Sequence, residues 1–141
     1  MSRYYEKYMK YKKLYIELKG GNINKYEIHV SEPWFSLLKS GKKKAEGRLN
    51  KGIFEKLNIG DIVVWFTMNK ETNEKMEFSS EIIDKQRYNT FREMLENEGL
   101  ENVLPDKNVE SIEDGVSVYR RWYNEDMEKK FGVLAIKIKL L

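Results

Sequence analysis

The 141-residue sequence contains no cysteine, one histidine and two prolines. Without cysteine, the protein has no disulfide, no thiolate metal site and no cysteine nucleophile. The single histidine, His29, would be the only base available to a Ser-His-Asp triad, and no serine lies in a nucleophile-elbow motif. A lone histidine in a strand is also typical of a structural residue. These absences leave few of the common hydrolase mechanisms open.

Long apolar segments and cofactor motifs are also missing. No run of about 18 apolar residues and no signal-peptide core is present, so we expect an intracellular protein without a membrane span. No P-loop, dinucleotide fingerprint or zinc signature appears, which predicts neither a cofactor nor a metal site. Aromatic residues make up 13% and charged residues 35% of the chain, a composition typical of one folded domain.

The basic charge is concentrated at the N-terminus. Residues 1–20 hold six Lys/Arg and two Asp/Glu, a net charge of +4, whereas the remaining 20 Lys/Arg and 21 Asp/Glu give −1. A stripe of residues at helical spacing predicts a leader helix over residues 1–21, ending in a hinge at Gly20 and Gly21; it consists of Tyr4, Tyr8, Tyr11, Tyr15 and Leu18. The stripe favours packing or self-association over a nucleic-acid arm. Residues 22–141 then form the second unit.

The rest of the chain alternates strand and helix patterns without a βαβ rhythm. Strands are predicted over residues 26–30, 62–66, 76–83 and 133–140, from alternating or continuous apolar runs. Helices are predicted over 33–40, from Thr90 to Gly99, and from Ser111 to about Tyr123, each with a capping or stop signal. We therefore expect an α+β fold, a mostly antiparallel β-barrel with peripheral helices, preceded by the N-terminal helix.

Residues 40–50 are the most unusual stretch, with four cations, one carboxylate and two glycines. If residues 45–49 are extended, Glu46 and Arg48 share one face of the strand because strand side chains alternate. Lysines and an arginine together attract phosphate or carboxylate groups. The alternative is an ordinary solvated lysine run with an exposed Glu46–Arg48 ion pair, which contributes little.

The spacing Gly41-x-Lys43-x-x-Glu46-x-Arg48 resembles the signature of the ASCH domain family, in the PUA-like superfamily. Further similar positions are found at residues 32–35, 60–61, 123 and 131–136. The resemblance implies a small β-barrel with an RNA-binding or nucleotide-binding cleft. Some members are amidohydrolases acting on acetylated cytidine, and at least one is described as a ribonuclease. The leader also resembles the Tyr/Lys-rich start of many giant DNA virus proteins, which suggests a viral origin and the host cytoplasm.

The hydrolase pattern uses a lysine, a threonine and a glutamate. Lys43 matches the lysine, Glu46 replaces the threonine, and Asp114 falls near the late acidic position. An aspartate at such a position is more often part of a helix cap than a catalytic acid. These three residues are the catalytic candidates if the protein is an enzyme.

The ligand-binding candidates surround the same stretch. Trp34 would stack on a base, although core packing explains a tryptophan there equally well. We predict that Lys43, Glu46 and Arg48 point into one shared cleft at an open end of the barrel. The full set of predicted RNA-binding or nucleotide-binding residues is Trp34, Gly41, Lys43, Lys44, Glu46, Arg48, Asn50 and Tyr123. Three functions remain open: a binding module, a hydrolase, or an interaction protein that acts through its leader.

Overall fold

The computed structural model of the protein describes residues 23–141. The predicted leader helix, its Gly-Gly hinge and the self-association expected of it fall in residues 1–22. They lie outside the described residues. The fold below therefore concerns the second predicted unit.

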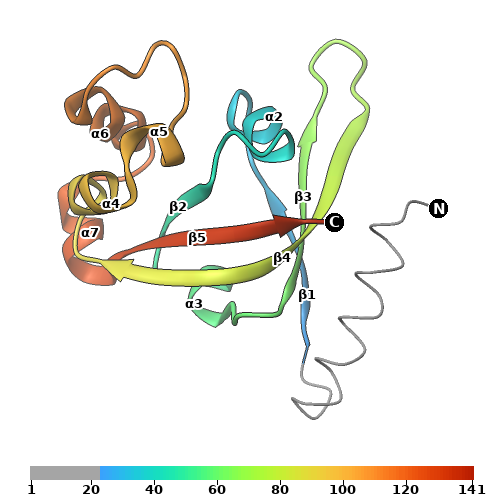
Figure 1. Ribbon diagram of the computed structural model, residues 1–141, viewed down its shortest axis with the longest axis horizontal. Helices are drawn as coiled ribbons and strands as arrows, with labels where there is room; N and C mark the ends of the chain where they lie inside the picture. The colour runs from blue at the N-terminus through green and yellow to red at the C-terminus, as the bar shows by residue number, and fades with distance from the viewer. Residues whose placement is uncertain (1–22) are drawn as a thin grey trace.

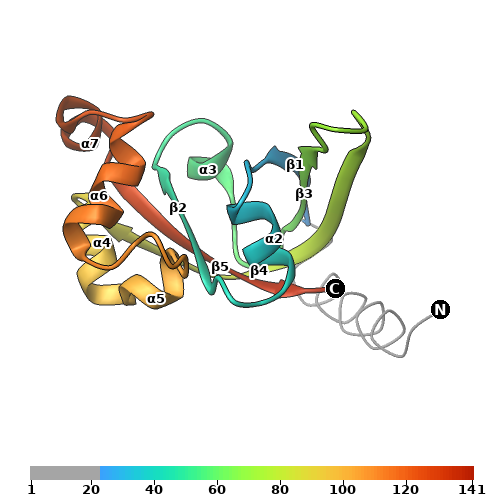
Figure 2. The same ribbon diagram turned by 90° about the horizontal axis from the view of Figure 1, so that it is seen from above.

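A five-stranded sheet forms the centre of the molecule (Figures 1 and 2). Its strands are β1 (Lys25–His29), β2 (Ala45–Leu49), β3 (Ile62–Met68), β4 (Lys75–Tyr88) and β5 (Val133–Leu140). Their order in the sheet is β1-β3-β4-β5-β2. The β1–β3 pairing is parallel, whereas the other three pairings are antiparallel. The mostly antiparallel character is as predicted.

The sheet curls into a half-barrel and does not close as the predicted barrel would. β1 and β2 are its two edges, and within residues 23–141 no ladder joins them. Instead, Arg48 Nη2 of β2 donates a hydrogen bond to the His29 carbonyl of β1 across the opening, at 2.9 Å. Polar side chains thus occupy the seam where a closed barrel would have backbone pairing, and the opening gives access to the interior.

Most of the described helices lie in one lobe, which is formed by the part of the chain between β4 and β5 (Figure 1). This lobe contains α4 (Phe91–Glu98), α5 (Leu100–Val103), α6 (Ile112–Arg120) and α7 (Glu125–Phe131). The remaining described helices are α2 (Trp34–Lys39), before β2, and α3 (Ile53–Lys56), after it. Within residues 23–141, none of the helices has the length and apolar character needed to cross a membrane.

The predicted caps of the two longest described helices are confirmed. Thr90 Oγ1 accepts a hydrogen bond from the Glu93 amide at 3.0 Å, and Ser111 Oγ accepts one from the Asp114 amide at 3.1 Å. α6 ends at Arg120, three residues before the predicted end at Tyr123, because a turn precedes a new N-cap at Asn124. That turn brings α7 back toward the sheet.

The core lies between the concave face of the sheet and the helices. Trp65 of β3 is fully buried, and its indole N–H donates to Ser80 Oγ at 2.8 Å. Ser80 Oγ in turn donates to the Val63 carbonyl at 3.1 Å. The strand predicted as the core centre is therefore buried, and its one polar indole atom has a partner, as a buried polar group requires.

Candidate functional site

β2 carries the charged residues that the sequence singled out. Ala45 and Leu49 are buried in the core, whereas Glu46 and Arg48 extend from the other face of the strand. Glu46 Oε2 lies 3.2 Å from Arg48 Nη2. The alternation predicted for this stretch is confirmed, but the pair is not the exposed one of the alternative reading: the Glu46 side chain is only 7% exposed.

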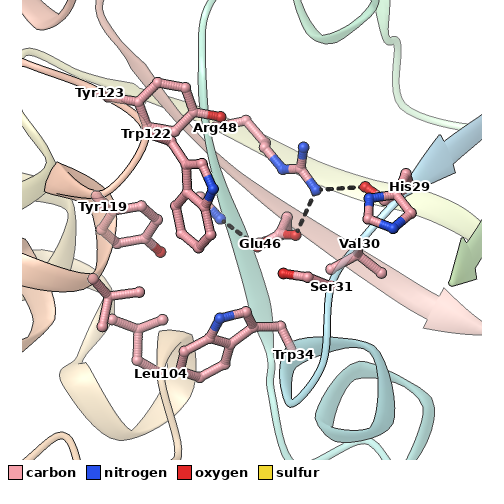
Figure 3. A pocket seen from close by; sticks show the side chains of 12 residues that line it. His29, Val30, Ser31, Trp34, Glu46, Arg48, Leu104, Tyr119, Trp122 and Tyr123 are labelled. Carbon is pink, nitrogen blue, oxygen red and sulfur yellow. Dashed lines mark hydrogen bonds and ion pairs between the residues drawn. The ribbon is translucent and has the colours of Figure 1, made fainter. Parts of the chain in front are cut away.

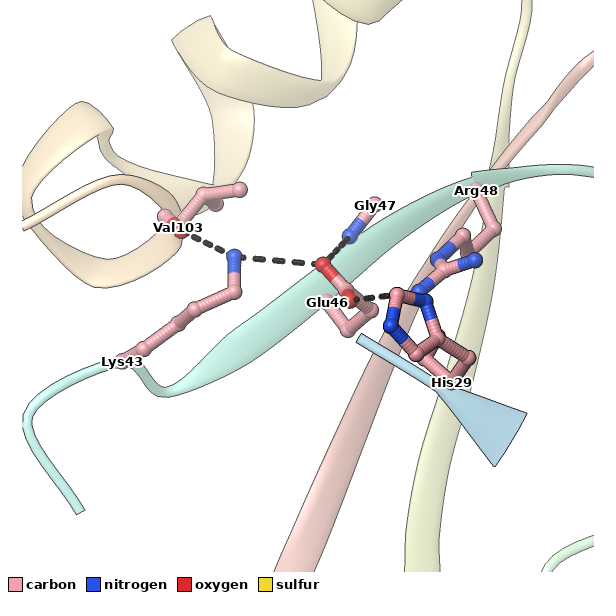
Figure 4. Close-up of polar contacts among 6 residues, drawn as sticks. All are labelled: His29, Lys43, Glu46, Gly47, Arg48 and Val103. Carbon is pink, nitrogen blue, oxygen red and sulfur yellow. Dashed lines mark hydrogen bonds and ion pairs between the residues drawn. The ribbon is translucent and has the colours of Figure 1, made fainter. Parts of the chain in front are cut away.

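Lys43 is the third member of this cluster and is fully buried (Figure 4). Its Nζ lies 3.3 Å from Glu46 Oε1 and also donates to the carbonyl of Val103 in α5. The ammonium group further lies 5.5 Å from the centre of the Trp34 ring. Lys43 thus joins β2 to the helical lobe, and Glu46 is held between two cations.

Burial and neighbouring charge set the protonation of this cluster. Burial alone would raise the pKa of Glu46, but the attraction of Lys43 and Arg48 outweighs it and leaves the pKa below its ordinary value. Burial lowers the pKa of Lys43, and Glu46 opposes that shift without cancelling it. Glu46 is therefore ionised at neutral pH and acts only as a hydrogen-bond acceptor.

A pocket of about 310 Å³ opens beside this cluster (Figure 3). It lies at the seam between β1 and β2 and is closed on its other side by α6 and the turn that follows. Its lining residues are His29, Val30, Ser31, Trp34, Glu46, Gly47, Arg48, Leu104, Val118, Tyr119, Trp122 and Tyr123. One side of the pocket is thus aromatic and the other charged.

Ring stacking and one buried carboxylate fix the aromatic side of the pocket. Phe91 stacks on Tyr119 with ring centres 4.1 Å apart and on Tyr123 at 5.4 Å. Buried Glu128 accepts from the Phe91 amide at 2.7 Å and from Arg120 Nη2 at 2.7 Å. Since Arg120 is the last residue of α6, this carboxylate ties the end of the helix to the start of α4. The two tyrosine rings are therefore held in place before any ligand arrives.

Gly47 allows the aromatic side to approach β2. A β-carbon at this position would lie 2.6 Å from the Tyr119 hydroxyl oxygen and 2.7 Å from Met94 Cε. A larger side chain would force the Tyr119 and Met94 side chains to shift. The absence of a side chain at Gly47 thus allows the aromatic wall of the pocket to come close to the strand.

The structure brings together only part of the predicted site. Trp34, Glu46, Arg48 and Tyr123 all line the pocket. Lys43 is adjacent but lies behind Glu46, so the prediction that three charged side chains share one cleft holds for two of them. A buried Lys43 cannot serve as a phosphate ligand.

The other predicted binding residues lie outside the pocket. Lys44 is exposed, and its amide donates to the Asn102 carbonyl at 2.6 Å. Gly41 ends α2 with a φ of 81°, a conformation that glycine adopts readily. Asn50 follows the end of β2, where its amide donates to the Gly132 carbonyl at 3.0 Å. These three residues shape the loops around β2.

Asp114 is not brought together with Lys43 and Glu46. It is exposed in the first turn of α6, and its Oδ2 accepts from the Glu110 amide at 3.0 Å. It lines a second hollow of about 660 Å³ next to the pocket, together with Asp106 and Arg121. The helix-cap alternative therefore accounts for its contacts, and no contact connects it to the buried cluster.

Sequence reasoning missed Tyr119 and Trp122. Both line the pocket, and the Trp122 side chain is 51% exposed at its rim. Their spacing with Tyr123, at positions i, i+3 and i+4, is that of one helix face and was the available signal. No group of three or more potential His, Asp or Glu metal ligands occurs in residues 23–141.

Comparison with known proteins identifies the family. The ASCH domain model matches residues 28–141. Among curated proteins, none matches the chain. The viral origin and the wider PUA-like relationship stay predictions.

Two solved structures are similar to this chain. The crystal structure of hypothetical protein PH0355 is 42% identical, with a TM-score of 0.71, over 83% of this chain and 99% of that one. The solution NMR structure of protein PF0455 from Pyrococcus furiosus is 43% identical, with a TM-score of 0.65, over 83% and 97%. The family model matches most of the chain, and the signature residues meet at one seam of the half-barrel. This chain therefore belongs to the ASCH domain family.

Proposed function

We propose that the protein binds an unpaired nucleobase, from RNA or a free nucleotide, in the pocket between β1, β2 and α6. The observation that carries the proposal is the pairing of aromatic walls with a charged floor in one small pocket. Its volume, about 310 Å³, lies at the lower end of the range for small-molecule pockets, about 300–1,000 Å³. That size suits one planar ring better than several stacked bases.

Trp122 and Tyr123 supply the stacking surface in this proposal. Unpaired bases in single-stranded RNA are commonly stacked on aromatic side chains and hydrogen-bonded at their edges. Trp122 is half exposed at the rim, so its ring is accessible to a base. Trp34 is almost fully buried and contacts Lys43, which makes it part of the pocket wall more than a mobile stacking partner.

Arg48 is the phosphate-binding candidate of the pocket. Its Nη2 is used by Glu46 and by the His29 carbonyl, whereas Nη1 and Nε have no hydrogen-bond partner within residues 23–141. The guanidinium also lies over Phe54, with 4.9 Å from Cζ to the ring centre. The predicted binding residues include Lys43, Lys44 and Arg48, which would together form a phosphate clamp, and the pocket offers one of these three cations.

Affinity for a single-stranded RNA octamer, measured against salt concentration, tests this proposal. One phosphate contact predicts a log–log slope of about −0.7, whereas the two or three contacts of the original clamp predict about −1.4 to −2.1. Trp122→Ala should weaken binding by about 1 to 3 kcal/mol, the usual contribution of one stacked base. Ile83→Ala is the matched control, because Ile83 is similarly exposed but does not line the pocket.

Two results would overturn the proposal. A steep salt slope together with full affinity of Trp122→Ala would place RNA binding on surface lysines and not in the pocket. Equal weakening by Trp122→Ala and Ile83→Ala would mean that the loss does not come from stacking.

Hydrolysis in the same pocket is supported less well by the geometry. Lys43, the residue that the hydrolase resemblance emphasises, has a side-chain exposure of 0% and does not line the pocket. The lowered pKa of Glu46 is the opposite of the raised value that favours a general base at neutral pH. We expect no cleavage of labelled RNA and no deacylation of acetylcytidine. Turnover by the wild type that is lost in Glu46→Gln would favour hydrolysis over binding alone.

A further inference from the structure

The Tyr119 hydroxyl is a buried polar group without a partner. The residue is 4% exposed, and its hydroxyl oxygen has no hydrogen-bond partner within residues 23–141. Most buried polar groups are paired, so an unpaired one needs an explanation. In Figure 3 this oxygen points into the space between Glu46 and Trp34.

The surroundings of Tyr119 do not offer the hydroxyl an alternative role. Its ring is held by stacking on Phe91, and its oxygen sits above Gly47 and beside Met94, neither of which has a side-chain group that binds it well. Burial, with a contribution from Glu46, raises the pKa of Tyr119 well above its ordinary value. The hydroxyl is therefore protonated and can donate a hydrogen bond.

Glu46 has capacity for one further hydrogen bond. A carboxylate offers about four lone-pair positions. Oε1 contacts Lys43 Nζ at 3.3 Å and accepts from the Gly47 amide at 3.2 Å, and Oε2 accepts from Arg48 Nη2 at 3.2 Å. One position on Oε2 is left, on the side chain that forms the pocket floor.

We propose that Glu46 and Tyr119 together read the Watson–Crick edge of one unpaired base. Glu46 accepts a hydrogen bond from an N–H of the base, and the Tyr119 hydroxyl donates to the neighbouring carbonyl oxygen or ring nitrogen. This inference rests on the proposed function and adds which edge of the base is bound. Each RNA base carries such a donor next to an acceptor on that edge, so the pair selects unpaired over paired bases.

The Trp122 side chain is the part of the pocket that would have to move for a base to enter. The Tyr119 hydroxyl is covered, and the half-exposed Trp122 ring lies among Tyr119, Glu46 and Arg48 in Figure 3. A base reaches the hydroxyl by displacing this ring, which then stacks on the outer face of the base. The free protein is left with the unpaired hydroxyl until a ligand supplies its acceptor.

Tyr119→Phe separates this role from a structural one because two readouts move in opposite directions. Removing an unpaired buried hydroxyl should raise the melting temperature of the free protein, by roughly 3 °C. The same change should weaken binding of a single-stranded RNA octamer about three- to tenfold, by loss of one hydrogen bond. The phenyl ring keeps the stacking on Phe91.

Tyr88→Phe is the matched control. The Tyr88 hydroxyl donates to Glu98 Oε2, away from the pocket, so its removal should lower the melting temperature and leave RNA affinity unchanged. A tyrosine with a purely structural hydroxyl behaves in this way. Tyr119→Phe should differ in both measurements, with a higher melting temperature and weaker RNA binding.

The experiment uses one octamer that contains all four bases, as a free strand and annealed to its complement, with wild type, Tyr119→Phe and Tyr88→Phe. We expect the wild type to bind the free strand at least tenfold more tightly than the duplex, and Tyr119→Phe to lose affinity for the free strand only. If the wild type binds neither form, the proposed function fails and this inference with it. If it binds the free strand but Tyr119→Phe has full affinity, or melts at a lower temperature than wild type, the function stands and the inference is overturned. Equal wild-type binding of strand and duplex overturns it as well.

Discussion

Two sets of opposite charges in this protein differ in their surroundings. Lys43, Glu46 and Arg48 form a cluster with side-chain exposures of 0%, 7% and 20% at the seam of the half-barrel. Arg92 and Glu113 form a pair that joins α4 to α6, with exposures of 44% and 73%. Water surrounds the second pair and screens it, whereas the first has lost its hydration and depends on its own partners. The comparison shows that burial, more than charge itself, identifies the cluster associated with a pocket.

The largest expected effect is on the buried cluster. Lys43→Met keeps the side-chain volume but leaves Glu46 with Arg48 as its one cationic partner. Removing one member of a buried ion pair costs about 3–5 kcal/mol of stability when the remaining charge is left without compensation, and here Arg48 offsets part of that loss. Urea unfolding of Lys43→Met and Lys44→Met measures this directly, since the two lysines are adjacent and Lys44 is exposed. Similar stabilities of the two variants would contradict the difference between buried and exposed charge.

The Glu46→Gln variant should reveal how much Glu46 contributes to stability, and how that contribution depends on pH. Hydrogen bonds to a charged group contribute about 1.5–3 kcal/mol, so the neutral amide should lower stability by a similar amount at pH 7. Because the folded-state pKa of Glu46 lies below its ordinary value of 4.5, its contribution is complete above that value and is lost as pH falls through the folded-state pKa.

The difference in unfolding free energy between wild type and Glu46→Gln reports this contribution, since groups that do not interact with Glu46 cancel. It should stay constant from pH 7 to about 5 and shrink only below the ordinary glutamate pKa. A difference that already shrinks between pH 7 and 6 would mean that the pKa of Glu46 is raised, which would favour the hydrolase alternative.

Gly47→Ala tests the contact between the two sides of the pocket. The new methyl group would lie 2.6 Å from the Tyr119 oxygen and 2.7 Å from Met94 Cε, and such overpacking costs about 1–3 kcal/mol. Combined with Tyr119→Phe, which removes the closer atom, the loss should be smaller than the sum of the two single effects. Additive effects in this double-mutant cycle would show that the hydroxyl is not in contact with Gly47.

The smallest effect is expected at the exposed pair. Arg92→Gln should leave stability and RNA affinity indistinguishable from wild type, since exposed ion pairs contribute little and are weakened by salt. Thermal melting at low and high salt checks this. A loss of stability in Arg92→Gln as large as that in Lys43→Met would contradict the difference between the exposed pair and the buried cluster.

The local structure of the site was predictable, but its assembly was not. Alternation along residues 45–49 correctly put Glu46 and Arg48 on one face, and the caps at Thr90 and Ser111 correctly started two helices. These features depend on neighbours in sequence. The burial of Lys43 depends on the Val103 carbonyl, 60 residues away, and a lysine run gives no sign of it.

The sheet and the aromatic wall illustrate the same limit. In the half-barrel that replaces the predicted barrel, Arg48 and the His29 carbonyl meet across the seam, a contact between strands that are distant in sequence. β4 extends to Tyr88, beyond the predicted end at residue 83, because β5 continues to pair with it past a bulge. Tyr119 and Trp122 were missed although their helical spacing with Tyr123 was visible, since aromatic residues on a helix usually form core.

The central claim, that an unpaired base enters the pocket at the seam, is tested most directly by NMR titration with the single-stranded octamer. The chain has three tryptophans, so three indole N–H signals can be followed. Trp34 and Trp122 line the pocket, whereas Trp65 is buried in the core and donates to Ser80, which makes it an internal control. We predict that the Trp122 signal shifts most and that of Trp34 shifts clearly, while that of Trp65 stays in place. An octamer that binds without moving the Trp34 and Trp122 signals would contradict the account.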